Sequence, residues 1–158
     1  MKCRVCGSKA IINLKRHNTS FCHNHFNEFF IKQVEKAIKK YSMFSREEEI
    51  LVCVSGGKDS LALWYALNKM GYKTKGLYIH LGIGDYSNES LQKVEKFAEK
   101  NNLPFIVKKL GIGRTISELS KKSGRKKCSV CGIVKRYFFN KIPHEQNIDV
   151  VATGHNMD

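Results

Sequence analysis

A short glycine-rich segment gives the strongest chemical signal in this sequence. Its six residues are Ser55, Gly56, Gly57, Lys58, Asp59 and Ser60. They follow the apolar run 50–54 and precede residues with helical periodicity. Glycines let consecutive backbone N–H groups face an anion, and the start of a helix adds further donors and a positive dipole end. The segment therefore predicts a loop that binds a triphosphate or a pyrophosphate.

Two features of this loop qualify the prediction. The Asp59 carboxylate would repel a phosphate, so we expect it either to bind Mg²⁺ or to cap the following helix. The loop is not a Walker A motif, because Val52 stands where that motif requires a glycine. A plain strand-to-helix turn is the alternative, but a lysine, an aspartate and two serines exceed what such a turn needs.

Four residues near the N-terminus have the spacing of a zinc site. Cys3 and Cys6 form one half-site, and Cys22 and His25 form a second with the same separation. Three thiolates and one imidazole complete a tetrahedron with no open position, which is typical of structural zinc. Because the segment is too short to build its own core, we expect the metal to supply folding energy. His17 and His23 are nearby competitors, and four unliganded side chains are the alternative.

A second cysteine pair, Cys128 and Cys131, needs partners from elsewhere, because two thiols cannot complete a metal site. The nearby cations are expected to stabilise thiolates and so to favour metal binding or reactivity. These cations are Arg125, Lys126, Lys127 and Lys135. A dithiol that cycles through a disulfide and a purely structural pair are the alternatives.

Strand and helix patterns alternate after the loop. The patterns predict strands at 50–54, 74–81, 105–110 and 149–153, and helices at 60–70, 87–101, 116–122 and 133–142. Such alternation predicts a doubly wound parallel α/β sheet whose ligands lie beyond the carboxyl ends of the strands. We expect a zinc finger at 1–28, a connecting amphipathic helix and linker at 29–48, and the α/β domain at 49–158.

The sequence is strongly basic, with 28 lysines and arginines against 14 acidic residues and a formal net charge of +14. Many of these cations crowd the stretch 121–136, which favours contact with a polyanion such as RNA over a merely solvated surface. The N-terminus lacks the apolar segment of an export signal, and no apolar stretch approaches the length of a membrane span. Six cysteines in a sequence without an export signal indicate metal ligands or reactive thiols and not a set of disulfides. A cytoplasmic location is expected.

The loop sequence resembles that of the PP-loop ATP pyrophosphatases, which adenylate a substrate and release pyrophosphate. The N-terminal cysteines and histidine, the run 128–137 and the run 152–158 narrow this further. In this order they look like the tRNA 2-thiouridine synthetases of the TtuA branch.

This resemblance implies an activity and a set of roles. It implies ATP-dependent thiolation of a tRNA uridine at C2, with ATP and Mg²⁺ at the loop, adenine beside His80, and Gly154 in the nucleotide site. It implies that Cys128 and Cys131, with a third cysteine further on, hold a 4Fe-4S cluster, and that Lys135 is catalytic. Implied partners are tRNA, a sulfur-carrier protein or sulfide donor, and a second copy in a homodimer.

The sequence stops at Asp158, inside the last of these motifs, without the third cluster cysteine. We therefore expect an α/β domain truncated on its C-terminal side, which keeps the nucleotide and zinc sites but is inactive alone. Two other functions remain open. One is a different PP-loop enzyme, such as an amidating or lysidine-type ligase, and the other is a non-catalytic, zinc-containing RNA-binding module.

Overall fold

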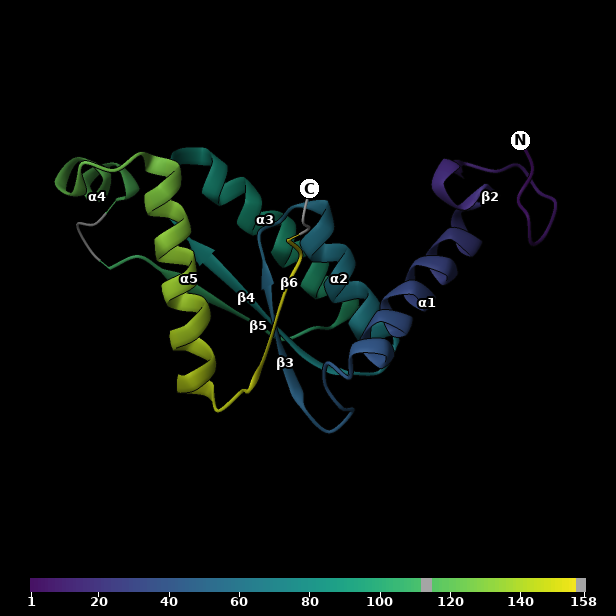
Figure 1. Cartoon of the computed structure of the whole chain (residues 1–158). Helices are drawn as coiled ribbons and strands as arrows, with labels where there is room; N and C mark the ends of the chain where they lie inside the picture. Colours follow the sequence, from purple (N-terminus) through teal and green to yellow (C-terminus); the bar gives the residue numbers. More distant parts are fainter. Residues whose placement is uncertain (112–114, 156–158) are drawn as a thin grey trace. The chain divides into compact units, whose positions relative to one another are not determined.

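The computed structural model describes residues 1–111 and 115–155 (Figure 1). The chain divides into two compact units, Met1–Phe44 and Ser45–Asp158. No helix within the described ranges is both long enough and apolar enough to cross a membrane. The last motif quoted above extends into residues 156–158, which lie outside the described residues.

The first unit is a small hairpin followed by a long helix. Strand β1 (Ile12–Leu14) pairs antiparallel with β2 (Thr19–Phe21), and a 3₁₀ turn at Lys15–His17 joins them. Helix α1 (His23–Tyr41) begins directly after β2. The rings of Phe21 and Phe29 stack with centroids 5.0 Å apart and so attach the hairpin to this helix. So few buried side chains make a core that needs another source of folding energy.

The second unit contains a four-stranded parallel sheet in the order β5-β4-β3-β6. The strands are β3 (Glu49–Val54), β4 (Lys73–His80), β5 (Phe105–Lys109) and β6 (Val150–Thr153). The chain first moves outward from β3 to β5 and then crosses to the other side of β3 to form β6. The strand order therefore reverses beside β3, and ligands of open α/β sheets bind at the carboxyl ends of the strands at such a point.

Helices cover both faces of this sheet, which confirms the predicted doubly wound α/β fold. Helices α2 (Lys58–Lys69) and α3 (Gly84–Asn101) pack on one face, where the fully buried Trp64 lies against Gly76 of β4. Helices α4 (Ile116–Ser123) and α5 (Lys127–Gln146) belong to the other face, where Phe138 and Ile142 pack with Leu51 and Leu77.

Three helices begin earlier than the sequence patterns predict. Helix α5 starts at Lys127 and not at residue 133, because buried Val130 shares a four-residue apolar period with Phe138 and Ile142 that continues through Gly132. Helix α2 starts at Lys58 and not at residue 60, and α3 starts at Gly84 and not at residue 87. Because α5 begins at Lys127, both cysteines of the second pair lie in its first two turns.

Candidate nucleotide pocket and metal centre

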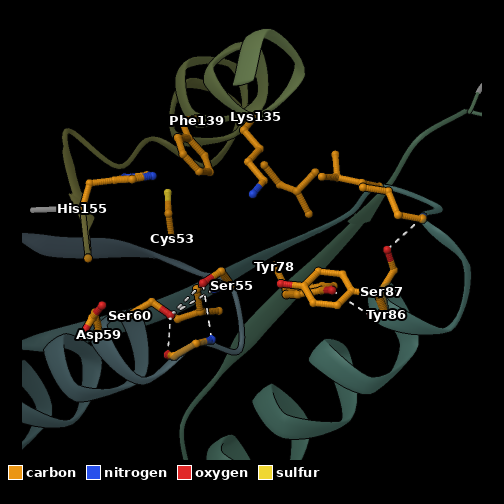
Figure 2. Close-up of a pocket in the computed structure, with 16 residues that line it drawn as sticks. Cys53, Ser55, Asp59, Ser60, Tyr78, Tyr86, Ser87, Lys135, Phe139 and His155 are labelled. Carbon is orange, nitrogen blue, oxygen red and sulfur yellow. Dashed lines mark hydrogen bonds between the residues drawn. The ribbon is translucent and has the colours of Figure 1, made fainter. Parts of the chain in front are cut away.

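A pocket of about 300 Å³ lies at the carboxyl ends of β3 and β4 (Figure 2). The glycine-rich loop and the start of α2 form its floor, and residues of α5 and of the segment after β6 complete its wall. The members that concern the site are Cys53, Ser55, Gly57, Asp59, Ser60, Tyr78, Ile83, Tyr86, Lys135, Phe139, Gly154 and His155. This is the edge of the sheet at which the strand order predicts a ligand.

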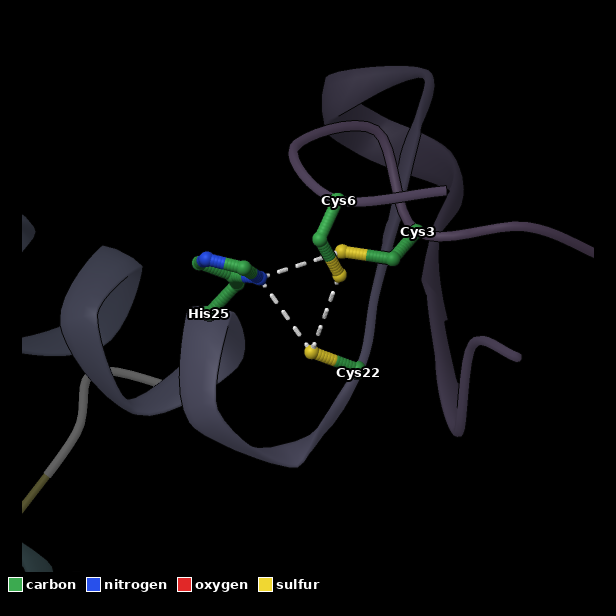
Figure 3. A group of neighbouring side chains, drawn as sticks. All are labelled: Cys3, Cys6, Cys22 and His25. Atoms are coloured by element: carbon green, nitrogen blue, oxygen red, sulfur yellow. Dashed lines mark hydrogen bonds between the residues drawn. The ribbon is translucent and has the colours of Figure 1, made fainter. Parts of the chain in front are cut away.

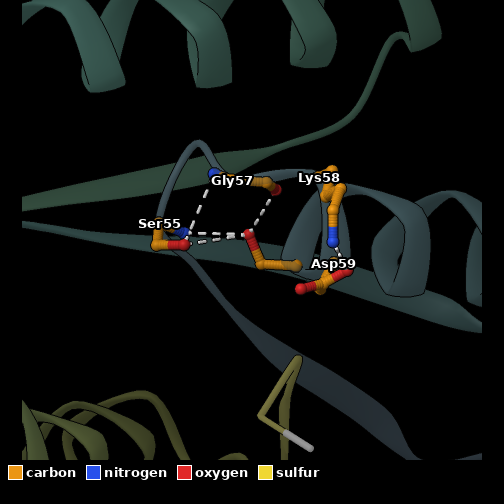
Figure 4. A network of polar contacts seen from close by, with 5 residues as sticks. Ser55, Gly57, Lys58 and Asp59 are labelled. Carbon is orange, nitrogen blue, oxygen red and sulfur yellow. Dashed lines mark hydrogen bonds and ion pairs between the residues drawn. The ribbon is translucent and has the colours of Figure 1, made fainter.

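Hydrogen bonds among its own residues hold the glycine-rich loop in shape (Figure 4). The Ser55 N–H donates to Ser60 Oγ at 3.1 Å, and Ser60 Oγ donates to the carbonyl of Gly57 at 3.0 Å. The Gly57 N–H donates to Ser55 Oγ at 3.4 Å. Ser60 is buried, and its hydroxyl group both accepts and donates a hydrogen bond within the loop. Its side chain therefore stabilises the loop conformation.

Two glycines are required here by close approach of neighbouring chain. Gly56 has a φ of +76°, and a Cβ at this position would lie 2.6 Å from the carbonyl oxygen of Ser90 on α3. A Cβ on Gly154 would lie 2.7 Å from the backbone of Ser60. Helix α3 and the end of β6 can therefore pack directly against the loop. Neither Gly56 nor Lys58 belongs to the lining of the pocket.

The charged residues of the loop divide between pocket and solvent. Asp59 lines the pocket, whereas the Lys58 side chain is 89% exposed and its Nζ lies 3.0 Å from Asp59 Oδ1. The residue that caps α2 is Gly57, and no side chain makes a capping bond there. The interpretation of Asp59 as a helix cap is therefore wrong, and binding of a cation is the role that its position allows.

Helix α5 supplies the positive charge that faces the loop across the pocket. Lys135 and Phe139 extend from this helix toward Ser55 and Ser60 (Figure 2). Cys53, at the end of β3, also points into the pocket, but burial raises its pKa to about 12. This thiol therefore stays protonated and contributes a small apolar surface.

The resemblance implied that adenine binds beside His80, at the end of β4, but other side chains line the pocket there. His80 is not in the lining, and its Nε2 lies 3.0 Å from Asn88 Oδ1 on α3. Ile83 and Tyr86 line the pocket beside Tyr78, whose hydroxyl donates to the carbonyl of Ser87 at 2.8 Å. Sequence reasoning missed all three, although their position directly at or after a strand end was an available signal.

The second cysteine pair lies on α5, with Cys128 exposed and Cys131 partly buried against the core. Burial raises the pKa of Cys131 more than Lys135 lowers it. The expectation that nearby cations would stabilise a thiolate is therefore wrong for this residue. The pair supplies two ligands, fewer than an iron-sulfur cluster requires, so the described residues do not complete such a site.

Thiol labelling should show this difference between the two cysteines. At pH 7.5 we expect iodoacetamide to modify exposed Cys128 first, Cys131 more slowly and Cys53 hardly at all. Because a raised pKa leaves less thiolate at neutral pH, the rate at Cys131 should still be rising with pH above 9.0. Peptide mass spectrometry at several times and pH values gives the rates. Faster labelling of Cys131 than of Cys128 at pH 7.5 would contradict the assignment.

The four predicted zinc ligands lie together in the first unit (Figure 3). The ligand atoms of Cys3, Cys6, Cys22 and His25 all lie within 4.8 Å of one another. Cys6 Sγ is 3.8 Å from Cys22 Sγ, and His25 Nδ1 is 3.2 Å from Cys22 Sγ. Ligands at zinc-bond length occupy tetrahedral corners about 3.8 Å apart, so these residues fit a zinc ion.

The competing histidines have other partners, and the ligand chemistry favours a metal. The His17 ring packs edge-on against Phe29, and His23 contacts Asn24. Desolvation raises the pKa of Cys3, but backbone hydrogen bonds, the strongest from Cys22, outweigh it and lower this pKa to about 6. The hydrogen bond to Cys3 raises the pKa of His25. A zinc ion would displace the proton that these groups share.

Comparison with known families accounts for both sites. Residues 26–158 match the PP-loop domain family, so the chain belongs to this family. Residues 2–27 match the N-terminal LIM domain of the 2-thiouridine synthetase TtuA, which confirms the narrower resemblance. The fold of a parallel α/β sheet with an N-terminal Cys/His cluster agrees with both matches.

Individual relatives agree with this placement. The chain is 44% identical over 160 residues to the tRNA-5-methyluridine(54) 2-sulfurtransferase of Thermus thermophilus, across 100% of this chain and 50% of that protein. The Thermotoga maritima protein of the same name is 43% identical, across 100% of this chain and 53% of that protein. A solved structure, the U34-tRNA thiolase NcsA from Methanococcus maripaludis with its 4Fe-4S cluster, is similar with a TM-score of 0.81 and 27% identity. It matches 99% of this chain and 54% of that chain, so this chain spans about half the length of these relatives.

Proposed function

We propose that this chain forms the nucleotide-binding and finger portion of an ATP-dependent enzyme that thiolates a tRNA uridine at C2. One observation carries the proposal: the glycine-rich loop and Lys135 face one pocket, and Lys135 shares helix α5 with the cysteine pair. The names of the matched sulfurtransferases support the choice of reaction. Because the chain spans about half of each, the activity is proposed for the protein that contains this chain.

The proposed reaction has two steps. The uracil O2 attacks the α phosphorus of ATP, the bond to the β phosphate breaks, and pyrophosphate leaves while N3 gives up its proton. A hydrosulfide-level nucleophile then attacks C2, the C2–O bond breaks, and AMP leaves. The sulfhydryl proton moves to N3 and leaves a 2-thiouridine. Adenylation is needed because it converts a poor oxygen leaving group into a phosphate ester.

The residues of this chain would share the work as follows. Backbone N–H groups of the loop would bind the triphosphate, and Lys135 would oppose negative charge on the phosphates from across the pocket. Lys58 would do the same only after its side chain leaves Asp59 and turns toward the phosphates. Mg²⁺ beside Asp59 would supply further charge neutralisation. Cys128 and Cys131 would hold two corners of a 4Fe-4S cluster whose remaining ligands lie outside the described residues. The basic stretch 121–136 would contact the tRNA backbone.

Partners and location belong to the same proposal. A sulfur-carrier protein or a sulfide donor delivers the sulfur, the complete protein is a cytoplasmic homodimer, and this chain alone is inactive because its cluster site is incomplete. Sulfur transfer by the isolated chain, in a reaction with tRNA, MgATP and sulfide, would contradict the last of these statements.

The test is the fate of ATP when the complete protein is incubated anaerobically with bulk tRNA and a sulfide donor. We expect AMP and pyrophosphate, a rate that rises with tRNA, and added sulfur in digested nucleosides. ADP and orthophosphate would overturn the proposal. AMP and pyrophosphate without RNA sulfur would favour an amidating or lysidine-type ligase, and RNA binding without ATP affinity would favour a non-catalytic module.

Substitution of Lys135 tests the pocket within this chain. We expect Lys135→Gln to weaken MgATP binding about 10-fold, because a cation facing phosphates across a partly enclosed pocket is worth more than one in water. Lys141→Gln is the matched control on the same helix, since that lysine pairs with Glu145 and is not in the pocket lining. Calorimetric titration of both variants measures the effect. Equal affinity for the two would remove Lys135 from the site.

A further inference from the structure

The first unit carries far more positive charge than a structural finger needs. Residues 1–44 contain nine lysines and arginines against two glutamates, a net +7 of the chain's +14. Residues 1–27 contain no acidic side chain at all. A surface that serves only solubility intersperses both signs, as helix α3 of the second unit does. A unit with this excess of positive charge attracts polyanions.

A polar hollow of about 370 Å³ lies on this finger, and none of the four candidate metal ligands belongs to its lining. Its lining residues, all with hydrogen-bonding side chains, are Lys2, Arg4, Asn13, Asn18, Thr19 and Ser20. A backbone hydrogen bond of 2.9 Å from Arg4 to Ser20 ties the segment of the first two cysteines to β2. Two cations of the N-terminal segment thus line the hollow together with amide and hydroxyl groups of the hairpin.

The wall of this hollow contains an unused hydrogen-bonding group. Thr19 is 7% exposed, and its Oγ1 has no hydrogen-bond partner within residues 1–111 and 115–155. Burial of such a hydroxyl without a partner is costly. The neighbouring Asn18 holds a left-handed conformation with a φ of 44°, which fixes the hairpin turn beside it. The hollow is therefore both preformed and incompletely satisfied.

We propose that this hollow binds the phosphodiester backbone of an RNA. Cations combined with asparagine, serine and threonine side chains are the groups that typically contact phosphate oxygens and carry no base specificity. A lipid surface would need a broad apolar face, whereas the lining of this hollow is polar throughout. The choice of RNA rests on the proposed function, and the finger then grips the same substrate at a place separate from the nucleotide pocket.

Metal binding and RNA binding are coupled in this arrangement. Arg4 lies between two metal ligands, Cys3 and Cys6, so a bound zinc ion fixes the backbone that carries its side chain. Removal of the metal therefore abolishes the alignment of Arg4 with the hairpin. The finger becomes an RNA-binding module that depends on zinc and does not depend on ATP.

The experiment measures binding of bulk tRNA by the whole chain without ATP, at several salt concentrations. We expect Lys2→Gln/Arg4→Gln to weaken binding about 10-fold at low salt and to reduce the slope of log affinity against log salt by about two, because two phosphate contacts are lost. Asn18→Gly/Ser20→Ala keeps the turn and the charge and should weaken binding about 3-fold. Lys93→Ala/Lys100→Ala, at two exposed positions of α3, is the charge-matched control. It should change both the affinity and the slope less than Lys2→Gln/Arg4→Gln does.

Zinc content is measured for each variant, so that a damaged finger is recognised. A loss of tRNA affinity with retained zinc supports the proposal, and unchanged affinity in Lys2→Gln/Arg4→Gln overturns it. Loss of binding to vesicles of anionic lipid, with tRNA affinity unchanged, also overturns it in favour of a membrane surface. Because no ATP is present, failure here leaves the proposed reaction intact, and failure of ATP cleavage leaves this result intact.

Discussion

Replacement of Gly56 by alanine is expected to lower the midpoint of thermal unfolding of the second unit by on the order of 10 °C. The Cβ would lie 2.6 Å from the Ser90 carbonyl oxygen, and the residue would have to keep a φ of +76°. The left-handed conformation alone costs about 1 kcal/mol, and a clash with backbone that cannot rotate away adds about 2 kcal/mol. Because the loop must move, MgATP affinity should fall at least 10-fold.

Gly82→Ala is the matched control for this substitution. Gly82 has a φ of +66°, but a Cβ there would meet no atom within 4 Å. It therefore carries the backbone penalty without the clash, and its unfolding midpoint should fall by only about 3–4 °C. Calorimetric scans of the two variants measure the unfolding midpoints, and titrations with MgATP measure the affinities. Equal losses of stability would show that the packing of α3 against the loop is not as described.

The parts of the site that sequence could predict are those in which chemistry and spacing are local. The glycine-rich loop is one continuous segment after a strand, and the two zinc half-sites are each four residues long. Their residue types restrict the function before any fold is known. The alternation of strands and helices then predicts the parallel sheet, because a parallel connection needs a crossover helix.

The parts that sequence could not predict depend on which way side chains point after folding. Lys58 lies within the loop motif but extends into solvent, whereas Lys135, far along the chain, faces the pocket. Strand alternation places His80 on the face of α3, where it contacts Asn88. Local charge suggested a thiolate at Cys131, but the burial that decides its pKa comes from packing on the sheet. These outcomes are set by tertiary contacts.

Loss of one zinc ligand should have the largest effect on the first unit. Cys22→Ser removes one sulfur ligand, at the residue that directly precedes α1. We expect zinc content to fall from about one per chain to near zero. Structural zinc sites contribute about 10–16 kcal/mol of apparent binding free energy, more than this small core can replace. Amide hydrogen exchange in the hairpin should therefore become fast, while the sheet of the second unit keeps its protection.

Cys128→Ser provides the comparison with the same chemical change. Cys128 is exposed on α5 and does not belong to the cluster of four, so zinc content and hairpin protection should stay at the level of the unmodified chain. Lowering the pH should release the metal as protons return to the thiolates, and release should begin below pH 6, because bound zinc holds the pKa of Cys3 below the value of about 6 that the backbone hydrogen bonds give it. If Cys22→Ser kept both its zinc and its hairpin protection, the tetrahedral assignment would be wrong, and the stability of the finger would have to come from the stacking of Phe21 on Phe29.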